Sequence, residues 1–367
     1  MGVVALLAIA ALAHGPPPHA VGVAAGDSDG PVFVRLTEGG AQRADDGWVF
    51  ACPALWGSVP DLPFGRAPGA TAWLHGAFDL VHLSPEGITE AQGVPELSVL
   101  ELVDVARGVD TSWALRRLDA GTELWRVEPA ERVWSGSGRA TSLVAEGDAV
   151  FVAELDGDRL DIVEVSTSGD EQSRTRWAEG VDYTPGLRRS GGELFLAERR
   201  VGDHVLLGPD GSVVTTSEDE ILGPVQGLVV RDFLLHQLVD GALVRTTEDA
   251  FVSCLEEVAG TVYACVFPDL YAVDVASGTL GEAVFRMDDL VEPRWDRVPE
   301  AMMMDCDVEW RRIAIDLGRD PGLPVDDDPK PEEPPEESGG CGGGRAGLWL
   351  LPLLVLLRPT RGSPDAP

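Results

Sequence analysis

The amino-acid sequence predicts an all-β protein, built as an antiparallel β-propeller of six or seven blades. Three observations favour this fold class: short apolar segments, turn signals between them, and a repeat of about 40 residues. The 367-residue chain contains 43 glycines and 27 prolines, a composition that favours many short strands over long helices. Between Gly22 and Pro293 no apolar pattern at helical spacing continues beyond two turns.

The predicted strands are short and contain β-branched or aromatic side chains. They cover residues 32–36, 72–74, 80–83, 149–153, 160–163, 193–197, 204–207, 233–236, 261–265 and 270–273. Turn signals, in which an acidic residue or a serine precedes glycine, separate the strands at 46–47, 86–87, 156–157, 168–169, 210–211, 240–241 and 277–278.

The predicted strands are grouped into a longer sequence repeat. Segments that resemble the inner part of a repeating unit recur 30 to 44 residues apart, near Phe33, Trp73, Trp113, Phe151, Phe195, Phe233 and Tyr263. Repeats of about 40 residues, each with four short strands, are typical of propeller blades. Dividing the roughly 270 residues of this region by about 42 gives six or seven blades. A pair of β-sandwiches and a solenoid are the alternatives.

The segment Leu36–Trp48 resembles the blade end of sialidase-type (BNR, Asp-box) propellers through Asp45, Asp46, Gly47 and Trp48. Residues 83–89 and 245–251 repeat the pattern more weakly. The resemblance implies structural turns, in which a carboxylate caps backbone N–H groups and glycine accepts a positive φ. It implies nothing about catalysis.

The N-terminus predicts export. Val3–Ala13 is an apolar run too short to span a bilayer, and Ala11-Leu12-Ala13 supplies the small residues of a cleavage site. We therefore assign residues 1–13 to a signal peptide and residues 22–293 to the propeller.

The cysteines agree with an oxidising compartment. Besides Cys341 there are four, Cys52, Cys254, Cys265 and Cys306, which allow three pairings into two disulfides. We favour Cys254–Cys265 across one strand-turn-strand unit, and Cys52–Cys306 between the beginning and the end of the domain. Four buried free thiols are the alternative. Zinc is not expected, because no C-x-x-C pair or nearby histidine has metal-site spacing.

The C-terminal part divides into three segments. Residues 294–318 form a cap segment, in which Asp307–Leu317 has the spacing of a short amphipathic helix beginning near Cys306. Residues 319–338 are rich in proline and acidic residues and form a disordered spacer. Residues 339–367 contain Gly340-Cys341 in a glycine patch, the apolar run Ala346–Leu357, then Arg358 and Arg361.

This last segment resembles the MYXO-CTERM sorting signal. The resemblance implies that a sorting protease cuts near Gly340-Cys341 and that lipid-modifying machinery attaches an anchor to Cys341, a logic parallel to that of a GPI signal. Ala346–Leu357 would enter the inner membrane transiently, and the mature protein would be held at the outer membrane, on the cell surface. The run is shorter than the ~20 residues of a stable span, and Pro352 interrupts it. A plain C-terminal anchor with an incidental cysteine is the alternative.

The net charge and the lack of catalytic motifs limit the classes of function that the sequence supports. A formal net charge of −34 argues against nucleic acid as a partner, although solubility explains an acidic surface equally well. No nucleophile elbow, phosphate-binding loop or metal motif stands out, so we predict no catalytic residue, no metal and no cofactor. Two weaker metal hypotheses place Ca²⁺ at Asp156, Asp158 and Asp161, or a metal at His75, Asp79 and His82; a solvated turn and ordinary strand histidines explain these residues better.

The sequence therefore predicts an exported, surface-anchored propeller that acts as a non-enzymatic binding module for a protein or a glycan. The alternative is a surface hydrolase acting on carbohydrate, for which fold analogy is the only support. Such a hydrolase needs two carboxylates about 5 to 9 Å apart.

Overall fold

The computed structural model describes residues 17–321 except 28, 46, 54–64, 67–71, 76–79, 85–86, 91–101, 108–110, 120, 128, 180–185, 201–202 and 299. At 24–27, 65–66, 72–75, 80–84, 87–90, 107 and 199–200 it describes the backbone alone. The chain divides into two units, 1–325 and 326–367, and every described residue belongs to the first. The predicted signal peptide and the predicted attachment site at Gly340 and Cys341 lie outside the described residues, as does nearly all of the spacer.

The described strands form seven sheets, each made of strands that follow one another in the chain. The first sheet consists of β1 (Ala20–Asp27), β2 (Gly30–Leu36), β3 (Gly40–Ala44) and β4 (Gly47–Ala51), with the late β29 (Leu290–Val291) added at its edge. The second consists of β5 (Gly65–Arg66), β6 (Ala72–His75), β7 (Leu80–Ser84) and β8 (Gly87–Glu90). The third consists of β9 (Leu102–Arg107), β10 (Ser112–Leu118), β11 (Gly121–Arg126) and β12 (Glu131–Gly136).

The remaining sheets repeat this plan. The fourth consists of β13 (Arg139–Glu146), β14 (Ala149–Asp156), β15 (Arg159–Ser166) and β16 (Glu171–Glu179), and the fifth of β17 (Gly186–Ser190), β18 (Glu193–Arg200), β19 (Asp203–Leu207) and β20 (Val213–Ser217). The sixth consists of β21 (Leu222–Val225), β22 (Leu228–Arg231), β23 (Leu234–Val239) and β24 (Ala242–Arg245), and the seventh of β25 (Val252–Val258), β26 (Thr261–Val266), β27 (Asp269–Asp274) and β28 (Thr279–Phe285). The 3-10 helices η3 (Met287–Asp289), η4 (Trp295–Arg297) and η5 (Glu300–Met302) and the helix α2 (Met303–Asp316) follow.

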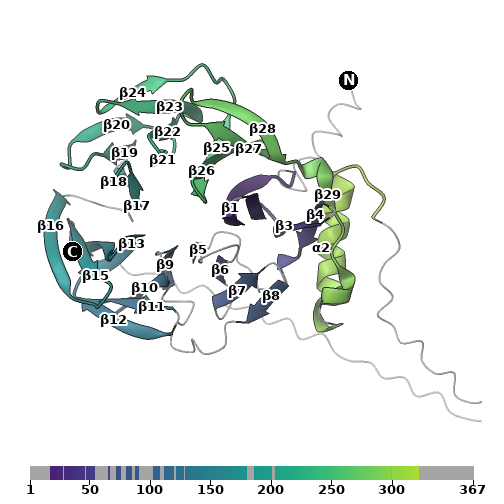
Figure 1. Cartoon of the computed structure of the whole chain (residues 1–367), viewed down its shortest axis with the longest axis horizontal. Helices are drawn as coiled ribbons and strands as arrows, with labels where there is room; N and C mark the ends of the chain where they lie inside the picture. The colour runs from purple at the N-terminus through teal and green to yellow at the C-terminus, as the bar shows by residue number, and fades with distance from the viewer. Residues whose placement is uncertain are drawn as a thin grey trace, which may run out of the picture. The chain divides into compact units, whose positions relative to one another are not determined.

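The sheets are arranged around a common centre in chain order, and each begins with its innermost strand (Figure 1). The first strands of successive sheets contact one another, from β1 and β5 through to β21 and β25, and β25 contacts β1. The fold is all-β and β-propeller-like, which confirms the predicted fold class at this level. The aromatic residues that revealed the repeat lie on the second strand of each sheet, with one exception: Phe233 lies in the turn between β22 and β23.

Apart from the added β29, each sheet is an antiparallel meander, which separates its connections into two groups. The turn between the second and third strands lies at the same end as the connection to the next sheet, because strand direction alternates. We call this end of the fold the connection end. The turns between first and second strands and between third and fourth strands lie at the opposite end. Residues far apart in the sequence therefore meet at the connection end, which positions the candidate site below.

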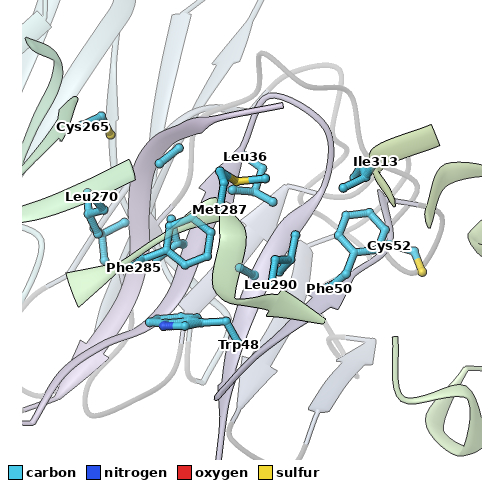
Figure 2. Packing of buried hydrophobic residues seen from close by; sticks show 14 of the residues in the cluster. Leu36, Trp48, Phe50, Cys52, Cys265, Leu270, Phe285, Met287, Leu290 and Ile313 are labelled. Carbon is cyan, nitrogen blue, oxygen red and sulfur yellow. The ribbon is translucent and has the colours of Figure 1, made fainter. Parts of the chain in front are cut away.

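The first and seventh sheets are joined by a seam that contains residues from both ends of the described chain. β29 pairs in parallel with β4, and the Glu256 Oε2 atom on β25 accepts a hydrogen bond from Val23 N on β1 at 2.9 Å. A buried core fills the seam, as Figure 2 shows with Trp48, Phe285 and Leu290. Such a mainly apolar core provides the principal favourable free energy of closure.

Helix α2 packs on the outer side of this seam, next to β29 and β4 (Figure 1). The ring of Trp310 lies 5.8 Å from that of Phe50, and Ile313 is fully buried. Cys306, in the first turn of α2, forms a disulfide with Cys52, which follows β4. The second disulfide joins Cys254 and Cys265, which face each other on β25 and β26. These are the two pairs that the sequence favoured.

The C-terminal cap extends slightly beyond the predicted limits. The helix begins at Met303, earlier than the predicted Asp307, because its first turn contains the exposed Met304 and Asp305 and therefore lacks the apolar spacing of the later turns. Arg319 N donates to Ala314 O, and the Arg319 guanidinium donates to the carbonyl oxygens of Leu290 and Asp288. The folded part therefore continues into the first residue of the predicted spacer. Among the described residues, no helix is long and apolar enough to cross a membrane.

Candidate functional site

An open pocket of about 520 Å³ lies at the connection end, where the third and fourth sheets meet. Three chain segments form it. The end of β10, the turn after it and the start of β11 contribute Arg117, Leu118, Asp119 and Gly121. The connection between the sheets contributes residues 137–139, and the end of β14 with its turn contributes residues 155–157. The wall thus consists of two hairpins, at their turns and adjoining strand ends, and one connecting segment.

Close backbone packing shapes the pocket. The Thr122 hydroxyl donates to Gly138 O at 2.7 Å, and Gly138 N donates to Glu154 Oε1 at 2.8 Å. A side chain at Gly138 would meet the Glu154 side chain and the Leu155 carbonyl oxygen, so only glycine lets the connection approach β14 this closely. Gly121 has a φ of +155°, and a Cβ there would collide with the carbonyl oxygen of Gly136.

The pocket lining presents both cationic and anionic groups. Arg117 and Arg139 line it, and among the described residues neither has an ion-pair partner, in a chain with a net charge of −34. Asp119 and Asp156 supply carboxylates, and Asp156 lies 3.8 Å from the Arg159 guanidinium. Ser137 adds a hydroxyl group. Such a lining can donate and accept hydrogen bonds around one polar ligand.

A buried ion-pair network lies beneath the pocket, on the face of the fourth sheet that meets the third. Glu154 and Asp161 are 1% and 3% exposed. Arg174 lies 2.6 Å from Glu154 and 3.8 Å from Asp161, and Arg159 lies 2.7 Å from Asp161. A hydrogen bond to Glu171 raises the pKa of Arg174; burial opposes this effect, and Glu154 adds to it. Charges this deeply buried require partners, which the two arginines provide.

The partly buried Asp104 links the inner strands of the same two sheets. Asp104 on β9 accepts hydrogen bonds from Leu143 N at 3.0 Å and Ser142 Oγ at 2.9 Å, both on β13. Burial raises the pKa of Asp104, while the hydrogen bond from Leu143 and the charge of Arg188 partly offset the increase. We assign Asp104 a structural role, because its carboxylate connects two neighbouring strands.

Glu123, which is also buried, lies on the face of the third sheet opposite to that of Asp104. Burial alone would raise the pKa of Glu123. Hydrogen bonds from Arg132 and the Trp125 indole, together with the charges of Arg132 and Arg116, outweigh burial and lower the pKa overall. Its carboxylate oxygens are thereby occupied.

The residues singled out in the sequence fall in several places. Asp45, Gly47 and Trp48 lie at the β3–β4 turn, where Asp45 is exposed and Trp48 is buried in the seam. Asp46 lies outside the described residues. The echo at 83–89 spans the equivalent β7–β8 turn, whereas the one at 245–251 lies in the connection between the sixth and seventh sheets. The Asp-box-like turn therefore lies far from the pocket, at the opposite end of the fold.

The structure tests only the first of the two metal sites considered from the sequence. Asp156 and Asp158 lie at the β14–β15 turn, but Asp161 is buried against Arg159 and Arg174, so the three do not form one set of ligands. His75 and His82 lie on the paired strands β6 and β7, and Asp79 and both imidazoles lie outside what the structure describes. In the part of the chain that the structure describes, one group of side chains lies close enough together to hold a metal ion: Cys52, Cys306 and Glu309. The two sulfur atoms of this group already form the seam disulfide.

Sequence reasoning missed the pocket arginines. Arg117 and Arg139 belong to no motif and are 22 residues apart, so no local pattern connects them. One usable signal exists: the glycines at 136 and 138, beside a strand end, indicate close backbone approach.

No family model matches the chain, and no curated protein matches it. Hsv2 from Kluyveromyces lactis is 15% identical over 51% of this chain and 64% of that chain, with a TM-score of 0.34. Virginiamycin B lyase from Staphylococcus aureus is 10% identical over 61% and 83%, with a TM-score of 0.42, and BamB from Moraxella catarrhalis is 14% identical over 49% and 59%, with a TM-score of 0.32. The match thus spans less than two thirds of the Hsv2 chain. The β-propeller-like fold is assigned from the chain's own sheets.

Proposed function

We propose that this chain is an exported, surface-anchored β-propeller of seven blades that binds a ligand at its connection end without transforming it. The pocket between the third and fourth sheets is the observation that carries the proposal. It places two arginines without ion-pair partners among the described residues beside carboxylates and a hydroxyl, a donor and acceptor set suited to a polar ligand.

Two features support seven blades over six. Seven sheets are formed by the described strands, and contacts between their first strands run around the whole set and return to β1. Each sheet contains the four meandering strands expected of a blade. The seam, with β29 on β4 and the Cys52–Cys306 disulfide, holds the last blade against the first.

The carboxylate pair beneath the pocket is unsuited to hydrolysis, which leaves Asp119 and Asp156 in the lining as the carboxylates that a hydrolase would use. A glycosidase needs two accessible carboxyl groups, one of which must donate a proton. Glu154 and Asp161 face each other on paired strands near the pocket, beside Arg159 and Arg174. Both are buried and ion-paired, so neither meets a substrate in the pocket. The surface hydrolase remains the second candidate, and the first experiment below separates the two.

The binding test uses the oxidised full-length protein and a panel of neutral and carboxylated oligosaccharides. We expect calorimetric titration to detect binding of at least one member, and chromatography to recover that member unchanged. Arg117→Ala combined with Arg139→Ala should weaken binding about a hundredfold or more, because each lost charged contact costs roughly 1.5 kcal/mol or more, which is about tenfold in affinity. Arg286→Ala, on an exposed residue after β28, is the matched control. Cleavage products would overturn the proposal, as would equal binding by the double variant.

The anchoring proposal rests on the resemblance at residues 339–367. In it, a sorting protease cuts near Gly340, and lipid modification at Cys341 attaches the protein to the outer membrane. Mass spectrometry of the protein recovered from cells should find a mature C-terminus near Cys341 and an added lipid mass. Cys341→Ala should release the protein or leave it uncut, while Ser338→Ala should behave as wild type. An unchanged C-terminus and unchanged surface retention in Cys341→Ala would refute it.

A further inference from the structure

A row of aromatic side chains lies at the connection end, on the sixth, seventh and first sheets. Phe233 lies in the β22–β23 turn, Phe251 immediately before β25, Phe267 immediately after β26, and His19 immediately before β1. Phe251 and Phe267 are 54% and 52% exposed, which is unusual for phenylalanine. We call these four residues the aromatic row.

The four side chains are neighbours in space. The rings of Phe233 and Phe251 are stacked, with centroids 4.1 Å apart. Val252 pairs with Val266 as the last pair of the β25–β26 ladder, so Phe251 and Phe267 flank the same ladder end. The rings of Phe267 and His19 have centroids 5.2 Å apart. The row therefore continues across three sheets, and it is held by strand ends.

The backbone at Phe233 has a conformation that is unfavourable for phenylalanine. Asp232 and Phe233 have φ values of 52° and 61°, the left-handed region in which a two-residue hairpin turn favours Asn-Gly. A bulky aromatic residue is strained in this conformation, and glycine would relieve the strain. The turn keeps Phe233, whose ring supports the exposed Phe251. A strained turn residue whose ring supports an exposed aromatic side chain points to a functional use of that side chain.

Acidic residues surround one side of the aromatic row. The Ser217 hydroxyl donates to Asp232 at 2.7 Å, which places the exposed run Glu218–Glu220 beside the β22–β23 turn. Glu248 and Asp249 directly precede the segment of Phe251. These segments contain six carboxylates and two arginines, Arg231 and Arg245, each of which is paired with an aspartate. The surroundings of the row are therefore strongly negative.

We propose that the aromatic row is a docking site for a basic polypeptide segment of a partner protein, one that alternates arginine or lysine with apolar side chains. Aromatic faces attract guanidinium and ammonium groups, and exposed rings supply the apolar contact that concentrates binding energy in a few residues. The carboxylates give charge complementarity and speed association. This inference rests on the proposed binding function and adds a second site, separate from the pocket.

The same charges exclude other occupants. A second copy of this chain carries a net charge of −34, so two aromatic rows would meet against strong repulsion. An anionic bilayer is repelled for the same reason. A neutral glycan could stack on the rings but would gain nothing from the carboxylates, which makes it a distinct outcome of the test.

The test measures fluorescence anisotropy of labelled ten-residue peptides with the oxidised full-length protein at two salt concentrations. We expect saturable binding of an alternating Arg-Leu peptide, weaker binding at higher salt, and no binding of the Glu-Leu peptide. Phe251→Ser combined with Phe267→Ser should weaken binding about tenfold or more. Glu218→Gln combined with Glu220→Gln should weaken it about threefold and reduce the salt dependence.

Matched controls separate docking from general attraction to an acidic protein. Val213→Ser combined with Val244→Ser removes apolar side chains of similar exposure, 54% and 51%, on outer strands. Glu193→Gln combined with Glu282→Gln removes two exposed carboxylates away from the row. Both should bind as wild type. The docking site is refuted if the phenylalanine variant binds equally well, if the Glu-Leu peptide binds equally well, or if a neutral oligosaccharide is the ligand that depends on the row. None of these results affects oligosaccharide binding in the pocket, so the two proposals fail separately.

Discussion

Removing the seam disulfide should destabilise the protein more than removing the hairpin disulfide. Cys52 and Cys306 are 254 residues apart, whereas Cys254 and Cys265 are 11 apart. In the chain-entropy model, a disulfide stabilises the fold by restricting the unfolded chain, and the effect grows with the logarithm of the loop length. The model gives about 5.5 kcal/mol for the longer loop and about 2.8 kcal/mol for the shorter one, each as an upper estimate.

The comparison is well matched, because both disulfides are buried. Cys52, Cys265 and Cys306 are fully buried and Cys254 nearly so. Replacing either pair with alanine therefore removes two sulfur atoms from a packed core, and the cavity costs largely cancel between the variants. The difference that remains, about 2.7 kcal/mol, reports the loop length.

Urea unfolding of the two double variants, followed by tryptophan fluorescence and by far-UV circular dichroism, measures this difference. We expect the lower midpoint for Cys52→Ala/Cys306→Ala, and hydrogen exchange should show earlier opening of α2 and β29. A seam variant that is no less stable than the hairpin variant would refute the loop-entropy reasoning. Coincident transitions with both probes are needed before midpoints are converted to free energies.

Three further outcomes are expected. Trp310→Ala should cost about 3 to 5 kcal/mol of unfolding free energy, because Trp310 packs on Phe50 in the seam; a loss below about 1 kcal/mol in urea unfolding would contradict this role. Arg174→Met should cost about 3 to 5 kcal/mol, since it leaves Glu154 buried without its cation, and adding Glu154→Gln should recover part of the loss; no recovery in the same assay would argue against the ion pair. The raised pKa of Asp104 means that its protonated form stabilises the fold fully below its ordinary pKa of 3.8, and that this contribution is lost as the pH rises through the raised folded pKa. Asp104→Asn should therefore reduce the fall in melting temperature that accompanies rising pH above pH 4. An unchanged profile of melting temperature against pH would contradict the raised pKa.

The fold was predictable because its signals are local. A glycine in each of several tight turns and an aromatic residue on most second strands recur with the length of one sheet, which is visible without any tertiary information. Cys254 and Cys265 are predictable for the same reason, since a single hairpin brings them opposite each other. The Cys52–Cys306 pair followed from the remaining two cysteines once this hairpin was assumed.

The seam and the pocket could not be read in this way. β29 has two residues, too few for any periodic pattern, and it pairs with β4 some 240 residues earlier only because the sheets return to their starting point. The pocket joins two turns and a connection, and the ion pairs beneath it involve residues on three different strands. The residues of the pocket and of the ion pairs come together only because of how neighbouring sheets are placed. The secondary-structure propensities of single residues carry no information about that placement.

Phe233 shows where a local rule and the structure disagree most informatively. Its apolar character predicted the start of a strand at 233–236, but the strand begins at Leu234 and Phe233 occupies the turn with a positive φ. Packing alone does not account for the choice, because the partner of its ring, Phe251, is itself more than half exposed. A sequence under selection for stability alone would place glycine at this turn and a polar residue at 251. Together the strained Phe233 and the exposed Phe251 place stacked aromatic rings in solvent at the cost of local stability, which is the basis for assigning this part of the connection end to a partner.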